Sequence, residues 1–351
     1  MPNSPLFSQN EEHHFYFYRP ENTFGSDANF SPWSLLINGS YDIYRNGGYD
    51  KKIWKTPYGA GFSNVWYNIR DPFARIRAFG TDEFISSEII NFKWNTKNAE
   101  FIPNFSDHVI GNGMEYAKLT EYFEYRNVTW PHFWAALTTT AYQVVNEVIE
   151  SGPDPRYVYV DMIADMYIYN TIGIALYSTE FGKKFFSETL PVFGWSPQPI
   201  YEPITGRLQN AGQNYVIRKN FSWSGKFSPM IYWGIYGMLG VSFKFSGDES
   251  YSFTFGQVVN KLKNTRARGF RKIDPNLDMA AGFFYDKNNS LMFSALFTGP
   301  GLYNVQFNLY PGLIEFGDVT PGVFLGIGEW DKFVCGITFS FTPAGIGYGR
   351  M

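Results

Sequence analysis

Long hydrophobic runs are absent from this sequence of 351 residues. No stretch reaches about 18 consecutive apolar residues, whereas a transmembrane helix needs about 20. The most hydrophobic candidate, residues 157–177, is interrupted by Asp161, Asp165 and Asn170. The sequence therefore excludes a membrane protein built from spanning helices.

Charged residues are also scarce. Asp, Glu, Lys and Arg make up 17% of the chain, below the roughly 25% that is typical of soluble domains. The formal net charge is −3, and the basic residues form no cluster along the sequence. Because nucleic-acid binding requires a basic patch, we expect no nucleic-acid partner.

Motifs of common catalytic and cofactor sites are missing as well. The single cysteine, Cys335, excludes an internal disulfide. There is no G-x-S-x-G nucleophile elbow, and the Gly-rich segments lack the Lys of a phosphate-binding loop. The two helices expected in the central region lack the Glu-x-x-His pair of di-metal bundles. We expect no cofactor and no metal, and we favour a non-enzymatic role over an enzymatic one.

Aromatic residues and glycine, by contrast, are abundant, at 20% of the chain and 34 residues respectively. In the C-terminal third, apolar and polar residues alternate with a period of two, for example over 303–309 and 333–341. Successive side chains of a strand point to opposite faces, so each strand has one apolar face and one small, uncharged face. A solvated face normally carries Lys, Glu or Arg, so their scarcity favours a lipid-embedded sheet.

This pattern predicts a mainly β fold, a transmembrane antiparallel β-barrel of roughly 8–12 strands with an inserted α-helical hairpin. The alternative is a soluble β-sandwich or a lipocalin-like barrel. We expect an N-terminal aromatic-rich region with the first barrel strand or strands (1–105), a helical hairpin (106–182) and the remaining barrel strands (183–351). In the first region, residues 59–66 alternate like a strand, and 31–46 fit a helix or a strand. The later strands are expected at 214–222, 229–245, 250–259, 276–285, 290–298, 302–310, 312–317, 321–327 and 332–342.

The hairpin is expected from helices at 129–150 and 160–177, separated by the helix-breaking segment 151–155. Both helices carry carboxylates among apolar residues, where such groups must be paired, hydrogen-bonded, metal-bound or protonated. Antiparallel packing would bring these acids together, with Arg156 as a counter-ion and a histidine from the preceding loop nearby. The candidate polar cluster comprises His108, Asn146, Glu147, Glu150, Asp161 and Asp165.

Three interpretations of this cluster remain open. The acids form a solvated face that favours the helix dipole at the helix start. They form a buried structural network that fixes the hairpin. Or they form a metal or acid–base site.

Several segments also carry a resemblance. They are residues 24–27 (FGSD), 34–42 (SLLINGSYD), 108–114 (HVIGNGM), 146–150 (NEVIE) and 161–174 (DMIADMYIYNTIGI). Together they resemble a family of uncharacterised bacterial outer-membrane proteins, classed only as a domain of unknown function, from Bacteroidota and other Gram-negative groups. The resemblance implies an outer-membrane β-barrel with an embedded helical segment, and it supplies no activity.

We therefore expect a monomeric protein in the outer membrane of a Gram-negative bacterium, in contact with lipid. Residues 1–12 lack the basic and apolar segments of a signal peptide, which we interpret as removed. The leading functional hypothesis is a structural, envelope-organising or transport role for a small amphipathic molecule, with the hairpin plugging or bracing the barrel. One alternative is a membrane-embedded hydrolase of lipid or lipopolysaccharide that uses the hairpin carboxylates. Another is a soluble periplasmic barrel that binds an apolar ligand.

Overall fold

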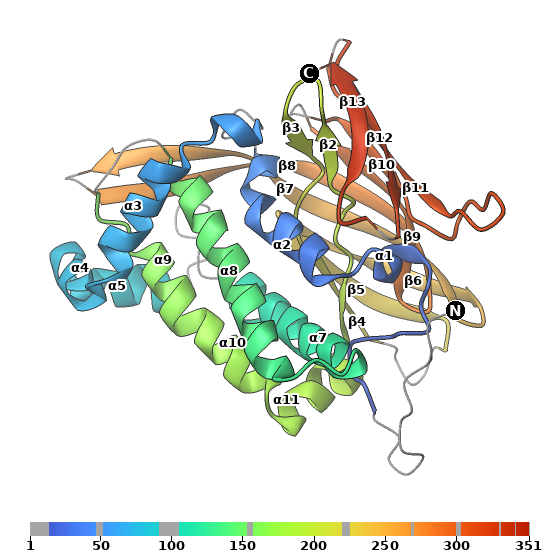
Figure 1. The fold of residues 1–351 in the computed structure, drawn as a ribbon, viewed down its shortest axis with the longest axis horizontal. Coiled ribbons are helices and arrows are strands. Elements are labelled where there is room, and N and C mark those ends of the chain that lie inside the picture. The colour runs from blue at the N-terminus through green and yellow to red at the C-terminus, as the bar shows by residue number, and fades with distance from the viewer. Residues whose placement is uncertain are drawn as a thin grey trace.

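The computed structural model describes residues 14–46, 52–90, 105–152, 157–219, 225–267, 270–299, 303–329, 331–340 and 342–350. Helices make up about 41% of the chain and strands about 33%. In Figure 1 most helices lie to one side of a single large sheet. The chain is therefore not mainly β as expected, because it contains more helix than strand. Helices occur from Gly25 to Thr189 and not only within 106–182.

The helices fall into two groups, and several π-helical turns continue directly into α-helices. The first group comprises α1 (Gly25–Ala28), α2 (Pro32–Ser40), η1 (Asp42–Asn46), η2 (Ile53–Lys55), α3 (Tyr58–Ile69), α4 (Pro72–Phe79), α5 (Thr81–Phe84) and η3 (Ile85–Ile89). The second comprises η4 (Phe105–Gly111), α7 (Asn112–Tyr125), α8 (Pro131–Ser151), α9 (Asp161–Ile163), η5 (Ala164–Tyr169), α10 (Asn170–Tyr177), α11 (Glu180–Lys184) and η6 (Phe185–Thr189).

Local sequence signals explain where the N-terminal helices form. The Ser31 hydroxyl accepts from the Ser34 backbone N–H, the Ser34 side chain accepts from the Ser31 N–H, and Pro32 opens α2. Residues 31–46 are therefore helical. The strand expected at 59–66 is wrong, because these residues lie in α3. The buried positions of α3, residues 61, 64, 65 and 68, have the spacing of one helix face. Packing of this face determines the local structure, and the period-two alternation over 59–66 does not.

The described strands form one sheet. They are β1 (Val192–Gly194), β2 (Ile200–Glu202), β3 (Arg207–Gln209), β4 (Asn214–Arg218), β5 (Phe227–Gly234), β6 (Tyr236–Ser246), β7 (Glu249–Ala267), β8 (Phe270–Lys287), β9 (Ser290–Thr298), β10 (Val305–Leu309), β11 (Pro321–Ile327), β12 (Phe333–Phe339) and β13 (Gly345–Arg350). From β4 to β13 each strand pairs antiparallel with the next along the chain, and β1 lies beside β4. β13 pairs parallel with β2, which is followed by β3 at the other edge.

Short connections hold the two edges of this sheet near each other. Residues 195–199 join β1 to β2, and residues 210–213 join β3 to β4. A connection of this length spans at most about 20 Å, so the sheet must curl until its edges are neighbours. Within the described residues no hydrogen-bonded pair joins β1 to β3, and the sheet is not closed.

The strand predictions hold where the alternation is long. β9 and β11 have the expected bounds, and β7 and β8 contain the expected strands 250–259 and 276–285 but extend beyond them toward each other. The expected strand 229–245 divides into β5 and β6 at Gly234, whose φ is +127°. The strand expected at 312–317 is wrong, because this segment contributes only a bridge between Phe316 and Val319. β13 was not expected. Its glycines face inward, where a Cβ on Gly347 would lie 2.4 Å from Ile200 of β2.

The concave face of the sheet carries an aromatic core. Trp195, Tyr232, Phe284 and Tyr310 are fully buried there, and Arg45 of η1 donates to the Asn214 side chain at 2.9 Å. The inner space is therefore filled by the sheet's own side chains and by N-terminal segments, not by the hairpin at 106–182.

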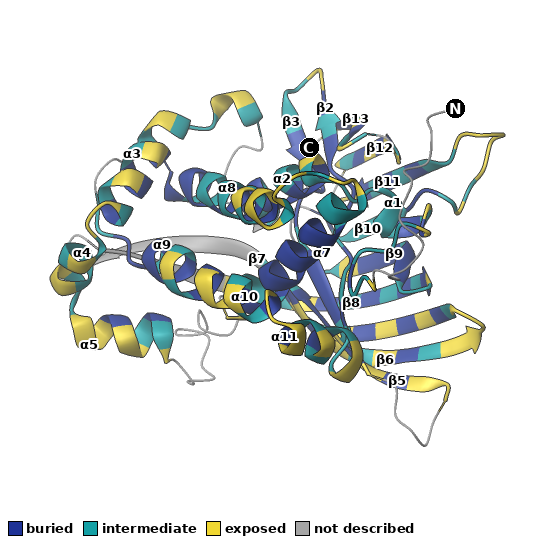
Figure 2. Ribbon diagram, turned by 60° about the horizontal axis from the view of Figure 1, so that its bottom comes forward, coloured by how far each residue is buried: buried dark blue, intermediate teal, exposed yellow. Residues whose placement is uncertain are grey.

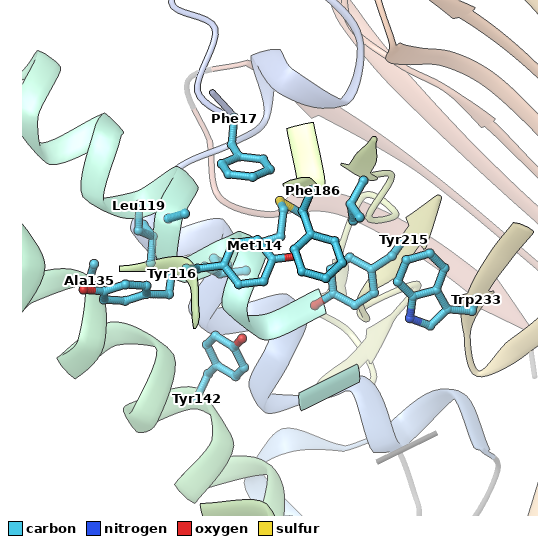
Figure 3. Packing of buried hydrophobic residues seen from close by; sticks show 13 residues of the cluster. Phe17, Met114, Tyr116, Leu119, Ala135, Tyr142, Phe186, Tyr215 and Trp233 are labelled. Atoms are coloured by element: carbon cyan, nitrogen blue, oxygen red, sulfur yellow. The ribbon is translucent and has the colours of Figure 1, made fainter. Parts of the chain in front are cut away.

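The helical layer is joined to the sheet near β1, β4 and β5. Figure 3 shows Met114 of α7 and Phe186 of η6 beside Tyr215 of β4 and Trp233 of β5, in one buried cluster. The two predicted helices are confirmed as α8 and the continuous helix α9–η5–α10. They do not form a simple hairpin, because α7 packs against both α8 and α10.

The described helices are all too short or too polar to cross a lipid bilayer.

Candidate functional site

The six residues of the predicted cluster lie on three helices that face one another, namely η4, α8 and the continuous helix that contains α9 and η5. His108 is on η4, and Asp165 is on η5. The others are Asn146, Glu147 and Glu150 on α8 and Asp161 at the start of α9.

His108 and Asp165 lie close together across two of these helices. His108 Nε2 lies 3.4 Å from Asp165 Oδ2, and the Gln143 amide lies 3.3 Å from His108 Nδ1. Gly173 of α10 makes this approach possible, since a Cβ there would lie 2.9 Å from the His108 carbonyl oxygen. Both η4 and η5 are π-helical, a rare geometry that is frequent at functional sites.

Burial and neighbouring charges disfavour ionisation of this pair. Burial raises the pKa of Asp165 well above its usual value, and the nearby carboxylates, Asp161 and Glu147 foremost, raise it further. Burial also lowers the pKa of His108 to about 4, against the opposing effect of Asp161. The surroundings therefore favour a neutral imidazole on His108 and the protonated form of Asp165.

Glu150 and Asp161 both contact the side chain of Tyr159. The Tyr159 hydroxyl lies 2.8 Å from Glu150 Oε1 and 2.8 Å from Asp161 Oδ2. Because the phenol has one hydrogen, it donates to only one of these carboxyl groups at a time. The cluster thus has two parts, one at His108 and one at Tyr159. Arg156, the expected counter-ion, lies outside the described residues.

Asn146 has a structural contact of its own. Its amide donates to the carbonyl oxygen of Gly39 at 3.0 Å and so ties α8 to the C-terminal end of α2. Gly39 is required in this position, because a Cβ would lie 2.3 Å from the Tyr142 ring. Asn146 therefore positions the helices that carry the acids.

A polar cavity of about 100 Å³ adjoins the His108 part of the cluster. It lies between η4, α8 and the sheet. Three predicted residues, His108, Asn146 and Glu147, line it, and Tyr142 and Tyr215, labelled in Figure 3, form part of its wall. The lining residues are Gly39, Asp42, Asp107, His108, Asn112, Tyr142, Gln143, Asn146, Glu147, Gln213, Tyr215 and Gly234.

Asp42 and Asp107 are site residues that the sequence interpretation missed. Burial raises the pKa of Asp107 to about 8, Asp42 adds to the increase, and Arg45 opposes it. Arg45 itself is held 2.5 Å from Asp42. The position of Asp107 directly before His108 was the available signal, whereas Asp42 comes from a segment distant in sequence.

Replacing Asp107 with Asn is expected to remove a pH-dependent loss of stability. The folded-state pKa near 8 exceeds the unfolded value near 3.9, so the wild type loses stability as pH rises from about 4 to 8. We expect Asp107→Asn to be as stable as wild type near pH 4 and more stable by on the order of 2 kcal/mol at pH 8. Denaturant unfolding across this range measures the difference. Asp82 is exposed, so the stability of Asp82→Asn should change with pH as that of the wild type does. If the stability of Asp107→Asn also changes with pH in parallel with the wild type, Asp107 is not the group responsible.

Metal binding has no support in the part of the chain that is described, where no three His, Cys, Asp or Glu side chains converge closely enough to hold an ion. The arrangement instead offers proton transfer between an imidazole and a protonated carboxyl group next to a polar cavity. Comparisons with family models, with curated proteins and with solved structures find no match to this chain.

Proposed function

We propose that this chain is an outer-membrane protein whose curled sheet lies in the lipid bilayer, with a structural or small-molecule transport role. The observation that carries the proposal is the apolar outer face of strands β5–β13. Figure 2 shows the alternation of exposed and buried residues along β5 and β6. On the outer face Leu239 is 68%, Phe253 63% and Ile346 68% exposed.

This exposed apolar face extends across the sheet and is not confined to one strand. Water-soluble monomers rarely expose contiguous apolar patches larger than a few hundred Å². An apolar exterior is what the hydrocarbon region requires of a spanning sheet. The outward-facing, exposed apolar residues are Phe227, Ile231, Leu239, Val241, Phe245, Tyr251, Phe253, Phe255, Met279, Phe297, Ile327, Ile337, Ile346 and Tyr348.

The inner face is mixed. Ser242, Ser252, Thr254, Ser294 and Asn308 are buried there, beside core residues such as Tyr232 and Phe284. An exposed ion pair of Asp331 and Arg350, at 2.8 Å, lies at the ends of β12 and β13. An apolar outer face, opposite an inner face filled by small polar and aromatic side chains, supports a bilayer location for a sheet with a filled interior.

The filled interior also bears on the role. The aromatic core on the concave face leaves no room for a wide aqueous channel. We therefore favour envelope organisation, or passage or binding of a small amphipathic molecule, by a monomeric protein. The helical layer braces the sheet from the β1–β4–β5 side.

Flotation with liposomes tests this proposal. Protein refolded in the presence of phosphatidylethanolamine and phosphatidylglycerol vesicles should float with them through a density gradient. Neither carbonate nor salt at about 1 M, which screens charges more than about 3 Å apart, should release it. Release by salt without detergent would contradict the proposal and favour a soluble sheet that binds an apolar ligand.

A second candidate function is hydrolysis of a membrane lipid or of lipopolysaccharide. The specific observation in its favour is that His108 Nε2 lies 3.4 Å from Asp165 Oδ2, at the meeting of two π-helical segments, and that His108 lines a cavity. Such a pair can take a proton from an attacking water and return it to a leaving group. Glu147 lines the same cavity.

Asp165→Asn is expected to lower the rate of this hydrolysis at least about a hundredfold, because the Asn amide cannot exchange a proton with His108. Fatty acid released from phospholipid or lipopolysaccharide vesicles, measured by mass spectrometry, is the readout. Glu147→Gln should lower it as well, while the exposed Glu180→Gln should not. If wild type releases no fatty acid, the hydrolase candidate is wrong. If both variants fail to fold, the cluster is a structural network.

A further inference from the structure

A second, larger cavity opens at one end of the sheet, away from the His108 cluster. Its volume is about 310 Å³. It lies where β4, β6 and β8 end and β5 and β7 begin, and it is closed on one side by residues 187–191 before β1 and by Arg19. Its lining residues are Arg19, Ser187, Glu188, Pro191, Phe193, Arg218, Lys219, Ser228, Ser242, Lys244, Asp248, Ser250, Asn288 and Asn289.

The charge of this cavity is positive. Four lining residues are Lys or Arg and two are Glu or Asp, so the lining carries a net charge of 4 − 2 = +2, or +1 when the buried Asp286 behind Arg218 is counted. Among the described residues, no carboxylate lies within ion-pair distance of Arg19, Lys219 or Lys244. Within the described ranges, the Lys219 ammonium donates to the backbone carbonyl of Glu188 at 2.9 Å.

The floor of the cavity is rigid and rich in donors. Arg218 binds Asp286 through two parallel bonds of 2.7 and 2.8 Å and donates to Ser242 Oγ at 2.9 Å. Since Ser242 accepts from Arg218, its own hydroxyl hydrogen is left to donate. Asn288 and Asn289 both have positive φ, which fixes the tight turn between β8 and β9 at the cavity wall.

Aromatic side chains lie on the outer face at the same end of the sheet. Phe245 stacks on Tyr251 with ring centroids 4.4 Å apart, and Phe227 lies 5.0 Å from Phe243. Aromatic residues concentrate where a membrane protein meets the headgroup region. The cationic cavity therefore lies at the depth where lipid phosphates would be found if the sheet is in a bilayer.

We propose that this cavity binds a phosphate group, with Lys219, Lys244 and Arg19 as its cationic contacts. Unneutralised ammonium and guanidinium groups beside hydroxyl donors are the usual protein partners of phosphate. The phosphate comes from an anionic lipid headgroup or from free phosphate. The lipid source rests on the proposed function, whereas the phosphate site itself rests on the cavity alone.

Binding to the full chain in neutral detergent micelles tests the site, with inorganic phosphate and dihexanoyl phosphatidylglycerol as separate probes in titration calorimetry. Lys219→Gln/Lys244→Gln is expected to raise Kd for the bound probe at least about tenfold, which corresponds to about 1.4 kcal/mol. Lys332→Gln is the matched control, since Lys332 is exposed at the opposite end of the strands. It should leave Kd within about twofold.

The probes distinguish the source of the phosphate. Binding of both, with competition between them, supports a lipid headgroup at this site. Binding of inorganic phosphate alone supports a free phosphate as the ligand. Absence of binding by either probe, or an unchanged Kd in the double variant, overturns the proposal. Flotation is measured separately. A protein that floats with vesicles but binds neither probe would therefore contradict the phosphate site and leave the proposed bilayer location intact.

Discussion

Phe253→Lys is expected to lower the free energy of unfolding in lipid vesicles by about 2–4 kcal/mol. Phe253 lies on the outer face near the middle of the part of β7 that pairs with both β6 and β8, opposite Val241 and Phe283. If this face contacts acyl chains, an ammonium group there must be desolvated or drawn to the bilayer surface. Reversible unfolding in denaturant, monitored by tryptophan fluorescence, measures the difference.

Phe245→Lys is the matched control for depth. Phe245 is also exposed and aromatic, but it lies at the end of β6, beside the turn to β7. Lys near the bilayer surface costs only about 0–1 kcal/mol. Each substitution removes one close ring contact, with Phe283 at 4.9 Å for Phe253 and with Tyr251 at 4.4 Å for Phe245. Equal and small effects at both positions would indicate a sheet that faces water.

The long strands could be predicted from sequence because one physical rule governs them. In β7 the residues Tyr251, Phe253 and Phe255 point outward, while Ser252 and Thr254 are buried. A face that is apolar without interruption, opposite a face of small residues, produces a period-two pattern with no competing interpretation. β13 breaks this rule, because its inward positions are glycines that make room for Ile200, and a run of glycines indicates a turn.

The short strands and the helix α3 could not be predicted in the same way. β1, β2 and β3 have three residues each, too few to display a period. Their pairing depends on the curl of the whole sheet. α3 buries Asn64 and Asn68, and the Asn68 side chain accepts from the Tyr159 N–H at 3.1 Å. A polar residue buried by a distant partner leaves no hydrophobic pattern on its own helix.

Helical spacing could predict that these acids lie near one another, but not how they are grouped. Helical spacing places Glu147 and Glu150 on one side of α8, which led to a single cluster of four acids. In the structure Glu150 and Asp161 meet at Tyr159, and Glu147 instead lines the cavity near His108. Asp42 reaches that cavity from η1, a segment distant in sequence from His108, and no local pattern encodes this contact.

Arg218→Met is expected to lower the free energy of unfolding by about 3–5 kcal/mol. Asp286 is fully buried, and Arg218 supplies both of its bidentate hydrogen bonds. Removing the guanidinium leaves a buried carboxylate without its counter-charge and removes the donor to Ser242 Oγ. Denaturant unfolding in neutral detergent micelles measures the loss.

Two further variants show whether burial is the cause. Arg350→Met breaks an ion pair of similar length, 2.8 Å to Asp331, but both of these side chains are more than 60% exposed, so the expected cost is below about 1 kcal/mol. Arg218→Met/Asp286→Leu removes both buried charges together and should recover most of the loss, because apolar side chains carry no desolvation penalty. If the double variant is no more stable than Arg218→Met, the loss comes from packing at Arg218 and not from the stranded charge of Asp286.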